Sequence, residues 1–221
     1  MRHRRLLERN FKNPSFFIQQ LAVSRIRHTR RDEKAVDVDP EQESEFVDLA
    51  RAGDRAAFSA LVDRYWLPLC RWLTGLTGNT HVAEDLTQEA FVRAWAAIPV
   101  LKEGRAFRVW LFRIARNTML LQQRGPRGIA PAGLDKEAED RTDGPLSQAM
   151  KSEALDALRV AIKRLPEPYR AVYLLWSQED FPYSEIARVL SITEETARWR
   201  VHEARRILVA DLNAYLESPS S

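Results

Sequence analysis

The sequence predicts an all-α protein made of two small helical domains joined by a flexible linker. Apolar residues recur at three- and four-residue steps in several stretches, and no stretch shows the sustained period-two alternation of a strand. A segment rich in Gly, Pro and acidic residues divides the helical stretches into two groups. We therefore expect a first domain over 44–124, a linker over 125–151 and a second domain over 152–217.

Charge is distributed unevenly along the chain. Residues 1–31 hold nine Arg and Lys residues against the single acid Glu8, and an acidic stretch follows at 32–45. This composition predicts that residues 1–43, a basic arm and an acidic linker, are disordered. Three interpretations of the arm stay open: nonspecific DNA contact, contact with a protein or membrane surface, and a start codon placed too far upstream.

Several classes of protein are excluded by what the sequence lacks. A single cysteine, Cys70, excludes an internal disulfide and a four-cysteine zinc site, which fits a reducing compartment. No run approaches the roughly 18 apolar residues of a spanning helix. The apolar segment 15–23 is interrupted by glutamines and precedes no cleavage pattern, so we expect a cytoplasmic protein. No phosphate loop, nucleophile motif or metal-ligand spacing is present, so we expect no enzyme, cofactor or metal.

The first domain is predicted to contain three main helices after a short one that begins near Ser44. In the first main helix, Asp54 is placed to cap the start, Pro68 to bend the axis, and two glycines, Gly75 and Gly78, lie near the end. The second should run from 79 to about 98 and the third from about 105 to 124. The apolar positions of the first main helix recur at helical spacing: Phe58, Leu61, Val62, Tyr65, Leu69, Trp72 and Leu73.

The third helix combines arginines with aromatic residues. From 105 to 127 there are six arginines, and no acid occurs between Glu103 and Asp135, which marks a candidate polyanion contact. Phe112 and Val109 are predicted to lie outside among the arginines, where a ring can stack on an unpaired base while guanidinium groups hold phosphates. The alternative is that Phe112 is covered by the preceding helices. The predicted buried stripe is Phe107, Trp110, Leu111, Ile114 and Thr118, and the predicted outward arginines are Arg105, Arg108, Arg113 and Arg116.

The second helix carries an acidic ridge on one face. Asp85, Gln88, Glu89 and Val92 fall at i, i+3, i+4 and i+7, away from the small apolar residues of the opposite face, which are Ala83, Leu86, Ala90 and Ala94. Phosphate would be repelled there, so the ridge suits a basic protein partner. An ordinary solvated helix face is the alternative interpretation.

The second domain ends in a predicted helix-turn-helix. It opens with apolar residues at helical spacing between Leu155 and Leu165, followed by a buried helix over 169–176. Ser184 is placed to cap a short helix through Leu190, residues 191–193 form a tight turn, and Thr193 is placed to cap a longer helix. Two short helices joined by such a turn suit entry into the major groove.

The longer helix has one inward and one outward face. Glu195, Trp199, His202 and Arg206 face outward, flanked by Arg198 and Arg205, while the inward stripe is Ala197, Val201, Ala204 and Leu208. Arginine can read guanine and glutamate can accept from cytosine, so this face suits base readout. A solvated charged face is the alternative. Trp199 could contact a thymine methyl group or pack against a neighbouring element or partner, and both interpretations stay open.

Three stretches together resemble the extracytoplasmic-function (ECF) sigma factors of bacterial RNA polymerase. They are AEDLTQEAFVRAW (83–95), FRVWLFRIARN (107–117) and LPEPYRAVYLL with YSEIARVLSITEETARWRVHEAR (165–205). The resemblance covers about 46–212, and the three stretches occur in the order and at the separation typical of the family. A stand-alone helix-turn-helix regulator that does not depend on core polymerase is the alternative.

The resemblance implies a role for each surface. The acidic ridge, with Asp85, Gln88, Glu89 and Val92, would bind the clamp coiled coil of the polymerase's largest subunit. The third helix would recognise and open the minus-ten element, binding duplex and single-stranded promoter DNA through Arg105, Arg108, Trp110, Phe112, Arg113, Arg116 and Asn117. The C-terminal domain would touch the flap of the second-largest subunit and read the minus-thirty-five element through Glu195, Thr196, Arg198, Trp199, Arg200, His202, Arg205 and Arg206.

The resemblance also implies an anti-sigma factor as a partner and no small-molecule substrate. A linker of about 25 residues can span about 80 Å, enough for two turns of DNA at about 35 Å each. The sequence departs from the family at three places. Leu120 to Arg124 replace a more charged run, Ser191 replaces the usual glycine of the turn, and Trp199 replaces a small residue.

Overall fold

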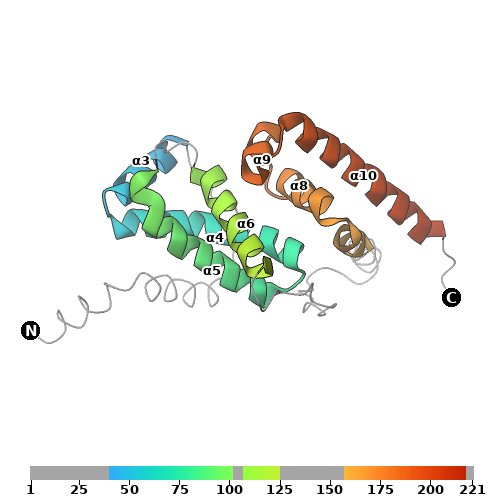
Figure 1. Cartoon of the computed structure of the whole chain (residues 1–221), viewed down its shortest axis with the longest axis horizontal. Helices are drawn as coiled ribbons and strands as arrows, with labels where there is room; N and C mark the ends of the chain where they lie inside the picture. Colours follow the sequence, from blue (N-terminus) through green and yellow to red (C-terminus); the bar gives the residue numbers. More distant parts are fainter. Residues whose placement is uncertain (1–39, 102–106, 125–156, 218–221) are drawn as a thin grey trace, which may run out of the picture. The chain divides into compact units, whose positions relative to one another are not determined.

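The computed structural model describes residues 40–101, 107–124 and 157–217, and this part of the chain contains helices and no strand (Figure 1). The all-α prediction is therefore confirmed. The described residues divide into two compact units, 40–71 with 81–101 and 107–124, and 72–80 with 157–217. Most of the predicted arm, and the predicted linker, lie outside the described residues.

The first unit is built mainly from four α-helices. They are α3 (Pro40–Arg51), α4 (Arg55–Thr77), α5 (Thr80–Ala97) and α6 (Phe107–Arg124), and a 3₁₀ turn, η1 (Ile98–Val100), follows α5. Helix α3 begins at Pro40, four residues before the predicted start, and the other helices begin and end within about two residues of their predicted bounds.

The start of α4 is set by the predicted cap. Oδ1 of Asp54 accepts hydrogen bonds from the backbone N–H groups of Ala56 (2.7 Å) and Ala57 (3.2 Å), which satisfies two donors of the first turn. Gly53, with φ of +96°, makes the preceding turn possible because glycine has no Cβ to clash there. Pro68 lies inside α4 as predicted.

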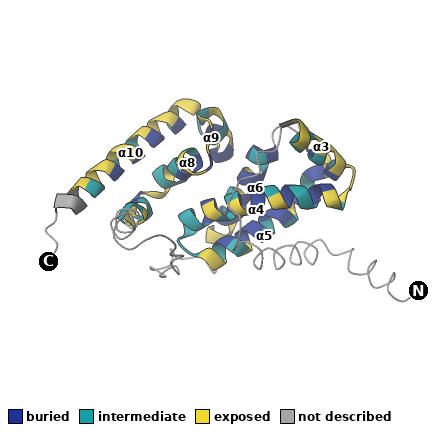
Figure 2. Ribbon diagram, turned by 180° about the vertical axis from the view of Figure 1, so that it is seen from behind, coloured by how far each residue is buried: buried dark blue, intermediate teal, exposed yellow. Residues whose placement is uncertain are grey.

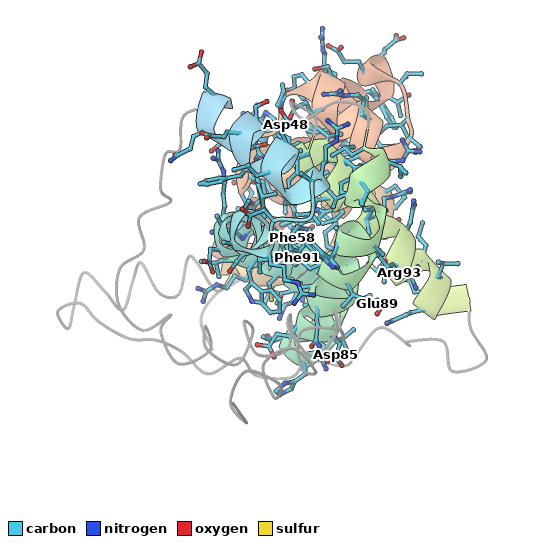
Figure 3. The ribbon with its side chains drawn as sticks, turned by 90° about the vertical axis from the view of Figure 1, so that its left-hand side faces the viewer. Asp48, Phe58, Asp85, Glu89, Phe91 and Arg93 are labelled. Carbon is cyan, nitrogen blue, oxygen red and sulfur yellow. The ribbon has the colours of Figure 1, made fainter. Side chains whose placement is uncertain are left out.

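Aromatic side chains join α4 to α5 in the core of the first unit. The ring of Phe58 packs edge-on against Phe91, with centroids 6.3 Å apart, and against Trp95 at 4.9 Å. The ring of Trp66 stacks on Phe91, with centroids 6.0 Å apart. Figure 3 labels Phe58 and Phe91 in this position. Because aromatic pairs in these geometries add to plain area burial, this cluster fixes the surface that α5 presents.

A partly buried polar contact holds α3 against α4. The Tyr65 hydroxyl donates a short hydrogen bond to the Glu43 carboxylate, and Nη2 of Arg64 lies 3.2 Å from Oε2 of Glu43. Burial of Tyr65, and then the negative charge of Glu43, raise the pKa of the Tyr65 hydroxyl well above its ordinary value near 10. The ring of Tyr65 also contacts Phe107 of α6, with centroids 5.7 Å apart. Tyr65 therefore links three helices of the unit.

The second unit contains helical residues 157–164, then α8 (Glu167–Ser177), α9 (Tyr183–Leu190) and α10 (Glu194–Glu217). Helix α10 packs against both α8 and α9, and Figure 2 shows its buried residues on one side and its exposed residues on the other. Part of the core lies where residues 157–165 meet α10. It is formed by Ala161, Leu165, Ala204 and Leu208, with Ile162, Tyr169, Tyr173 and Ile207 packed around them.

Candidate nucleic-acid interface

The turn between α9 and α10 has the geometry expected of a helix-turn-helix. Helix α9 ends at Ser191, whose backbone lies in the left-handed region (φ 54°, ψ 47°). The N–H of Ile192 then donates to the carbonyl of Ala187 at 3.0 Å, closing the helix end. Ser191 occupies a conformation that glycine adopts without strain.

The two predicted caps have different outcomes. Oγ1 of Thr193 accepts the N–H of Thr196 at 3.1 Å, so Thr193 caps α10 as predicted. The cap at Ser184 is wrong, because α9 begins one residue earlier and Pro182 occupies the capping position without a side-chain hydrogen bond. The hydroxyls of Thr193 and Thr196 lie 2.7 Å apart, so the Thr196 side chain takes part in the cap.

Helix α10 has the two faces that its spacing predicts. The inward stripe is buried, with Ala197 at 0%, Val201 at 1%, Ala204 at 0% and Leu208 at 4% exposure. Thr196 and Arg200 are half-buried at the edges of the helix. The outward face is exposed over six predicted site residues, which are Glu195, Arg198, Trp199, His202, Arg205 and Arg206.

Arg206 is held by a neighbour on its own helix. Its Nε and Nη2 atoms donate to the two carboxylate oxygens of Glu203, at 3.0 and 2.6 Å. The hydrogen bond from Arg206 lowers the pKa of Glu203. Glu203 engages only Nε and one hydrogen of Nη2, so the edge formed by Nη1 and the second Nη2 hydrogen is the part of the guanidinium left for a base or phosphate. The i,i+3 spacing of the two residues is the sequence signal for this pair.

The two flanking arginines also contact groups of the same chain. Nη2 of Arg198 donates to Oε1 of Glu194 at 3.0 Å, and its guanidinium carbon lies 5.5 Å from the centre of the Tyr183 ring. The guanidinium carbon of Arg205 lies 5.5 Å from the centre of the Trp176 ring. The outward face thus carries arginines that are already partnered, a feature that the sequence interpretation missed.

Trp199 combines exposure with a fixed contact. Its side chain is 55% exposed, and its ring centroid lies 5.9 Å from that of Tyr169 on α8, with the planes inclined at 56°. Of the two open interpretations, packing against a neighbouring element is therefore observed, and more than half of the residue stays open to solvent.

The prediction that Phe112 lies outside on α6 is wrong. Its side chain is fully buried, at 0% exposure, and Val109 is buried at 6%. The buried arc of α6 is turned toward Phe112, so that Ala115 and Met119 are buried with it. Two members of the predicted stripe, Trp110 and Ile114, are only half-buried. The other three members are buried as predicted, namely Phe107, Leu111 and Thr118.

The outward face of α6 presents a different aromatic residue. Trp110, half-buried, is followed at i+3 and i+7 by Arg113 and Asn117, both exposed. The Trp110 ring packs on Phe107, with centroids 5.8 Å apart. Arg108 and Arg116 are half-buried, and Arg105 lies outside the described residues. The structure thus brings Trp110, Arg113 and Asn117 to one face and removes Phe112 from it.

The acidic ridge of α5 forms one wall of a groove. Asp85 is exposed and the other three predicted residues are half-buried, while the opposite face of α5 is buried as predicted. The ridge is less acidic than its sequence indicates, because Nε of Arg93 lies 2.7 Å from Oε1 of Glu89 (Figure 3). The groove has a volume of about 470 Å³, and α5 and α6 line it through Asp85, Gln88, Glu89, Val92, Arg93, Thr118, Leu121 and Gln122.

Two kinds of site are absent from the described part of the chain. Among residues 40–101, 107–124 and 157–217, no group of three His, Cys, Asp or Glu side chains could hold a metal ion. Within the same ranges, no helix is long and apolar enough to cross a membrane.

Both units of the chain match a known protein family. Residues 61–125 match the model of Sigma-70 region 2, and residues 155–208 match that of Sigma-70 region 4. The chain is 31% identical over 168 residues to the ECF RNA polymerase sigma factor SigW of Bacillus subtilis, which covers 72% of this chain and 90% of that protein. It is 33% identical over 165 residues to SigL of Mycobacterium tuberculosis, again covering 72% of this chain and 90% of the relative.

Solved structures agree with this placement. The structure of CnrH in complex with the cytosolic domain of CnrY matches with a TM-score of 0.59 and 25% identity, covering 81% of this chain and 99% of that one. The sigma factor RpoE of Bartonella quintana, solved with the anti-sigma factor NepR, has the same fold, with a TM-score of 0.58 and 22% identity over 71% of this chain and 96% of that one. The chain therefore belongs to the ECF sigma factors of RNA polymerase.

Proposed function

We propose that this sigma factor directs core RNA polymerase to promoters through three separate surfaces. The α5–α6 groove binds polymerase, the outward face of α6 acts on the minus-ten element, and the outward face of α10 reads the minus-thirty-five element. The observation that carries the proposal is α10 itself. A capped helix after a tight turn has its apolar stripe buried and a mainly polar face exposed, as entry into the major groove requires.

At the minus-ten element we assign the aromatic contact to Trp110 in place of Phe112. Trp110 is accessible and lies on the same face as Arg113 and Asn117. An indole beside a guanidinium can stack on an unpaired base and hold the adjacent phosphate. Phe112, buried at 0% exposure, instead supports the helix from inside. Arg105, Arg108 and Arg116 remain proposed phosphate contacts.

The polymerase contact is proposed for the groove. Asp85, Gln88 and Glu89 supply carboxylate and amide oxygens, and Val92 and Leu121 supply apolar surface beside them. This mixture suits a basic amphipathic helix, such as one from the clamp coiled coil of the largest subunit, because opposite charges fix the register of docking while apolar contacts hold it. The second unit is proposed to touch the flap of the second-largest subunit.

The remaining partners and the location follow from the same role. The chain is proposed to be a regulatory protein without catalytic activity and to work in the cytoplasm, where core polymerase and the chromosome lie. Two similar solved structures are complexes, one of CnrH with the cytosolic domain of CnrY and one of the sigma factor RpoE with the anti-sigma factor NepR. We propose that this chain is likewise held by an anti-sigma factor. A stand-alone helix-turn-helix regulator is not favoured, because regions 2 and 4 both match.

The proposal is tested by transcription in vitro with core polymerase over a library of genomic fragments. We expect transcripts that start downstream of a shared pair of elements. Asp85→Lys should weaken binding to core polymerase at least about tenfold, since like charges would then face each other. Glu45→Lys, the same charge change at an exposed position of α3, should leave binding unchanged. A chain that binds an operator tightly alone and ignores polymerase would overturn the proposal.

The role of Trp110 is tested separately by permanganate footprinting of the opened promoter. Trp110→Ala should reduce thymine reactivity in the minus-ten region while closed complexes still form. Arg113→Ala should weaken binding and make it less sensitive to salt, because it removes a phosphate contact. Unchanged thymine reactivity in Trp110→Ala would remove Trp110 from the melting surface.

A further inference from the structure

We propose that Trp199 is a specificity-determining residue that contacts thymine methyl groups in the minus-thirty-five element, with Tyr169 positioning its indole. The inference deepens the proposed function and rests on it, because it requires α10 to enter the major groove. Trp199 differs in exposure from the apolar stripe of α10. Trp199 is 55% exposed on a helix whose apolar stripe is no more than 4% exposed.

The position of Trp199 on α10 places it toward DNA. Glu195, His202 and Arg206 lie at i−4, i+3 and i+7 from it, and all three are exposed. Residues at these spacings share one face of a helix. Trp199 therefore lies in the middle of the polar face, among the residues that base readout would use.

The contact with Tyr169 restrains the indole on one side. The two rings lie 5.9 Å apart, and Tyr169 itself packs against the core of the second unit. A side chain whose rotamer is held before binding loses less conformational entropy when it binds. The rotamer of Trp199 is therefore restrained before DNA binds, and the exposed part of its indole remains accessible to a ligand.

The side chains beside Trp199 on the outward face of α10 indicate which group of the DNA it would contact. Arg198 and Arg206 each share part of their guanidinium with Glu194 and Glu203, so fewer of their N–H donors remain for base edges. Trp199 adds an apolar surface between them. The only apolar group that base pairs offer in the major groove is the 5-methyl of thymine. An exposed, restrained indole therefore fits a thymine methyl better than any hydrogen-bonding edge.

The test uses holoenzyme and a promoter in which each minus-thirty-five thymine is replaced, one at a time, by deoxyuridine. This replacement removes only the methyl group. Wild-type holoenzyme should lose affinity about fourfold at one or two positions, the value expected for one buried methyl group. Trp199→Ala holoenzyme should bind the thymine promoter about as weakly and should show no further loss with deoxyuridine at those positions.

Matched variants separate positioning from folding. Arg206→Ala should keep the loss on deoxyuridine replacement, since it leaves the indole in place. Tyr169→Phe should keep it too, whereas Tyr169→Ala should reduce it, and circular dichroism melting establishes that each variant is folded.

Three results would overturn the inference. The first is a deoxyuridine loss in Trp199→Ala equal to that of wild type; if transcription is also impaired, Trp199 contacts a protein. The second is no deoxyuridine loss at any position in wild type. The third is an element without thymines. A failure of the proposed function looks different, because holoenzyme would then start no specific transcripts from any promoter.

Discussion

Replacing Phe112 by alanine tests whether the residue belongs to the core or to the DNA surface. The side chain is fully buried in α6, and burying a phenylalanine removes about 150–250 Å² from water. At about 25 cal/mol per Å² this corresponds to roughly 4–6 kcal/mol as an upper bound. Measured Phe→Ala changes in cores cost about 3–5 kcal/mol, which we take as the expected loss in the free energy of unfolding.

A loss of this size is large beside the total stability of a domain, which is about 5–15 kcal/mol. For a domain of about 80 residues, each kcal/mol shifts Tm by about 4–8 °C, so Phe112→Ala should lower Tm by at least about 12 °C. The measurement is thermal unfolding of the full chain, followed by circular dichroism at 222 nm. Any defect in promoter opening should disappear when the assay is run well below the lowered Tm.

Trp110→Ala is the matched control on the same helix. Trp110 is half-buried and packs on Phe107, so its removal should cost only about 1–2 kcal/mol. Its opening defect should persist at every temperature at which the variant is folded. A Tm for Phe112→Ala within about 3 °C of wild type would refute the reasoning, because a fully buried ring cannot be removed at so small a cost.

Three further predictions concern single contacts, each measured by chemical denaturation. Ser191→Gly should raise the free energy of unfolding by about 0.5–1 kcal/mol, because it relieves the left-handed backbone at φ 54°; no gain would show that the turn is unstrained. Asp54→Ala should cost about 1 kcal/mol through loss of the α4 cap, whereas Asp54→Asn should cost less. The pKa of the Tyr65 hydroxyl is raised in the folded protein. Its contribution to the free energy of unfolding is therefore complete below about pH 10, the pKa of an unfolded tyrosine, and is lost as the pH rises above that value. Wild type should therefore lose stability between about pH 10 and 12 faster than Tyr65→Phe does, and equal losses would contradict this assignment.

The α10 helix was predictable from the sequence, and α6 was predictable only in part. Between Glu194 and Arg206 of α10 the apolar positions are few and separated by charged residues, so one stripe is favoured, and the structure buries it. In α6 the residues from Phe107 to Ile114 are mostly apolar, and more than one stripe fits the helical period. The buried arc is rotated from the predicted stripe by somewhat less than one residue step of about 100°, and this rotation exchanges Phe112 for Trp110.

Contacts between side chains were the least predictable part of the site. Ion pairs such as Arg206 with Glu203 and Arg93 with Glu89 occur at i,i+3 and i,i+4 spacing, which permits a pair without requiring one. The contact of Trp199 with Tyr169 joins residues 30 positions apart and depends on how α8 packs against α10. Nothing local in the sequence specifies such packing.

The paired arginines of α10 have a consequence for how the protein searches a genome. From Glu194 to Arg206 the helix carries four arginines against three glutamates, so its formal charge is close to neutral. Attachment to random DNA comes almost entirely from cations that displace condensed counterions, and a nearly neutral helix displaces few of them. We therefore expect α10 to contribute little to binding at random sequences, so that this domain should dissociate quickly from them.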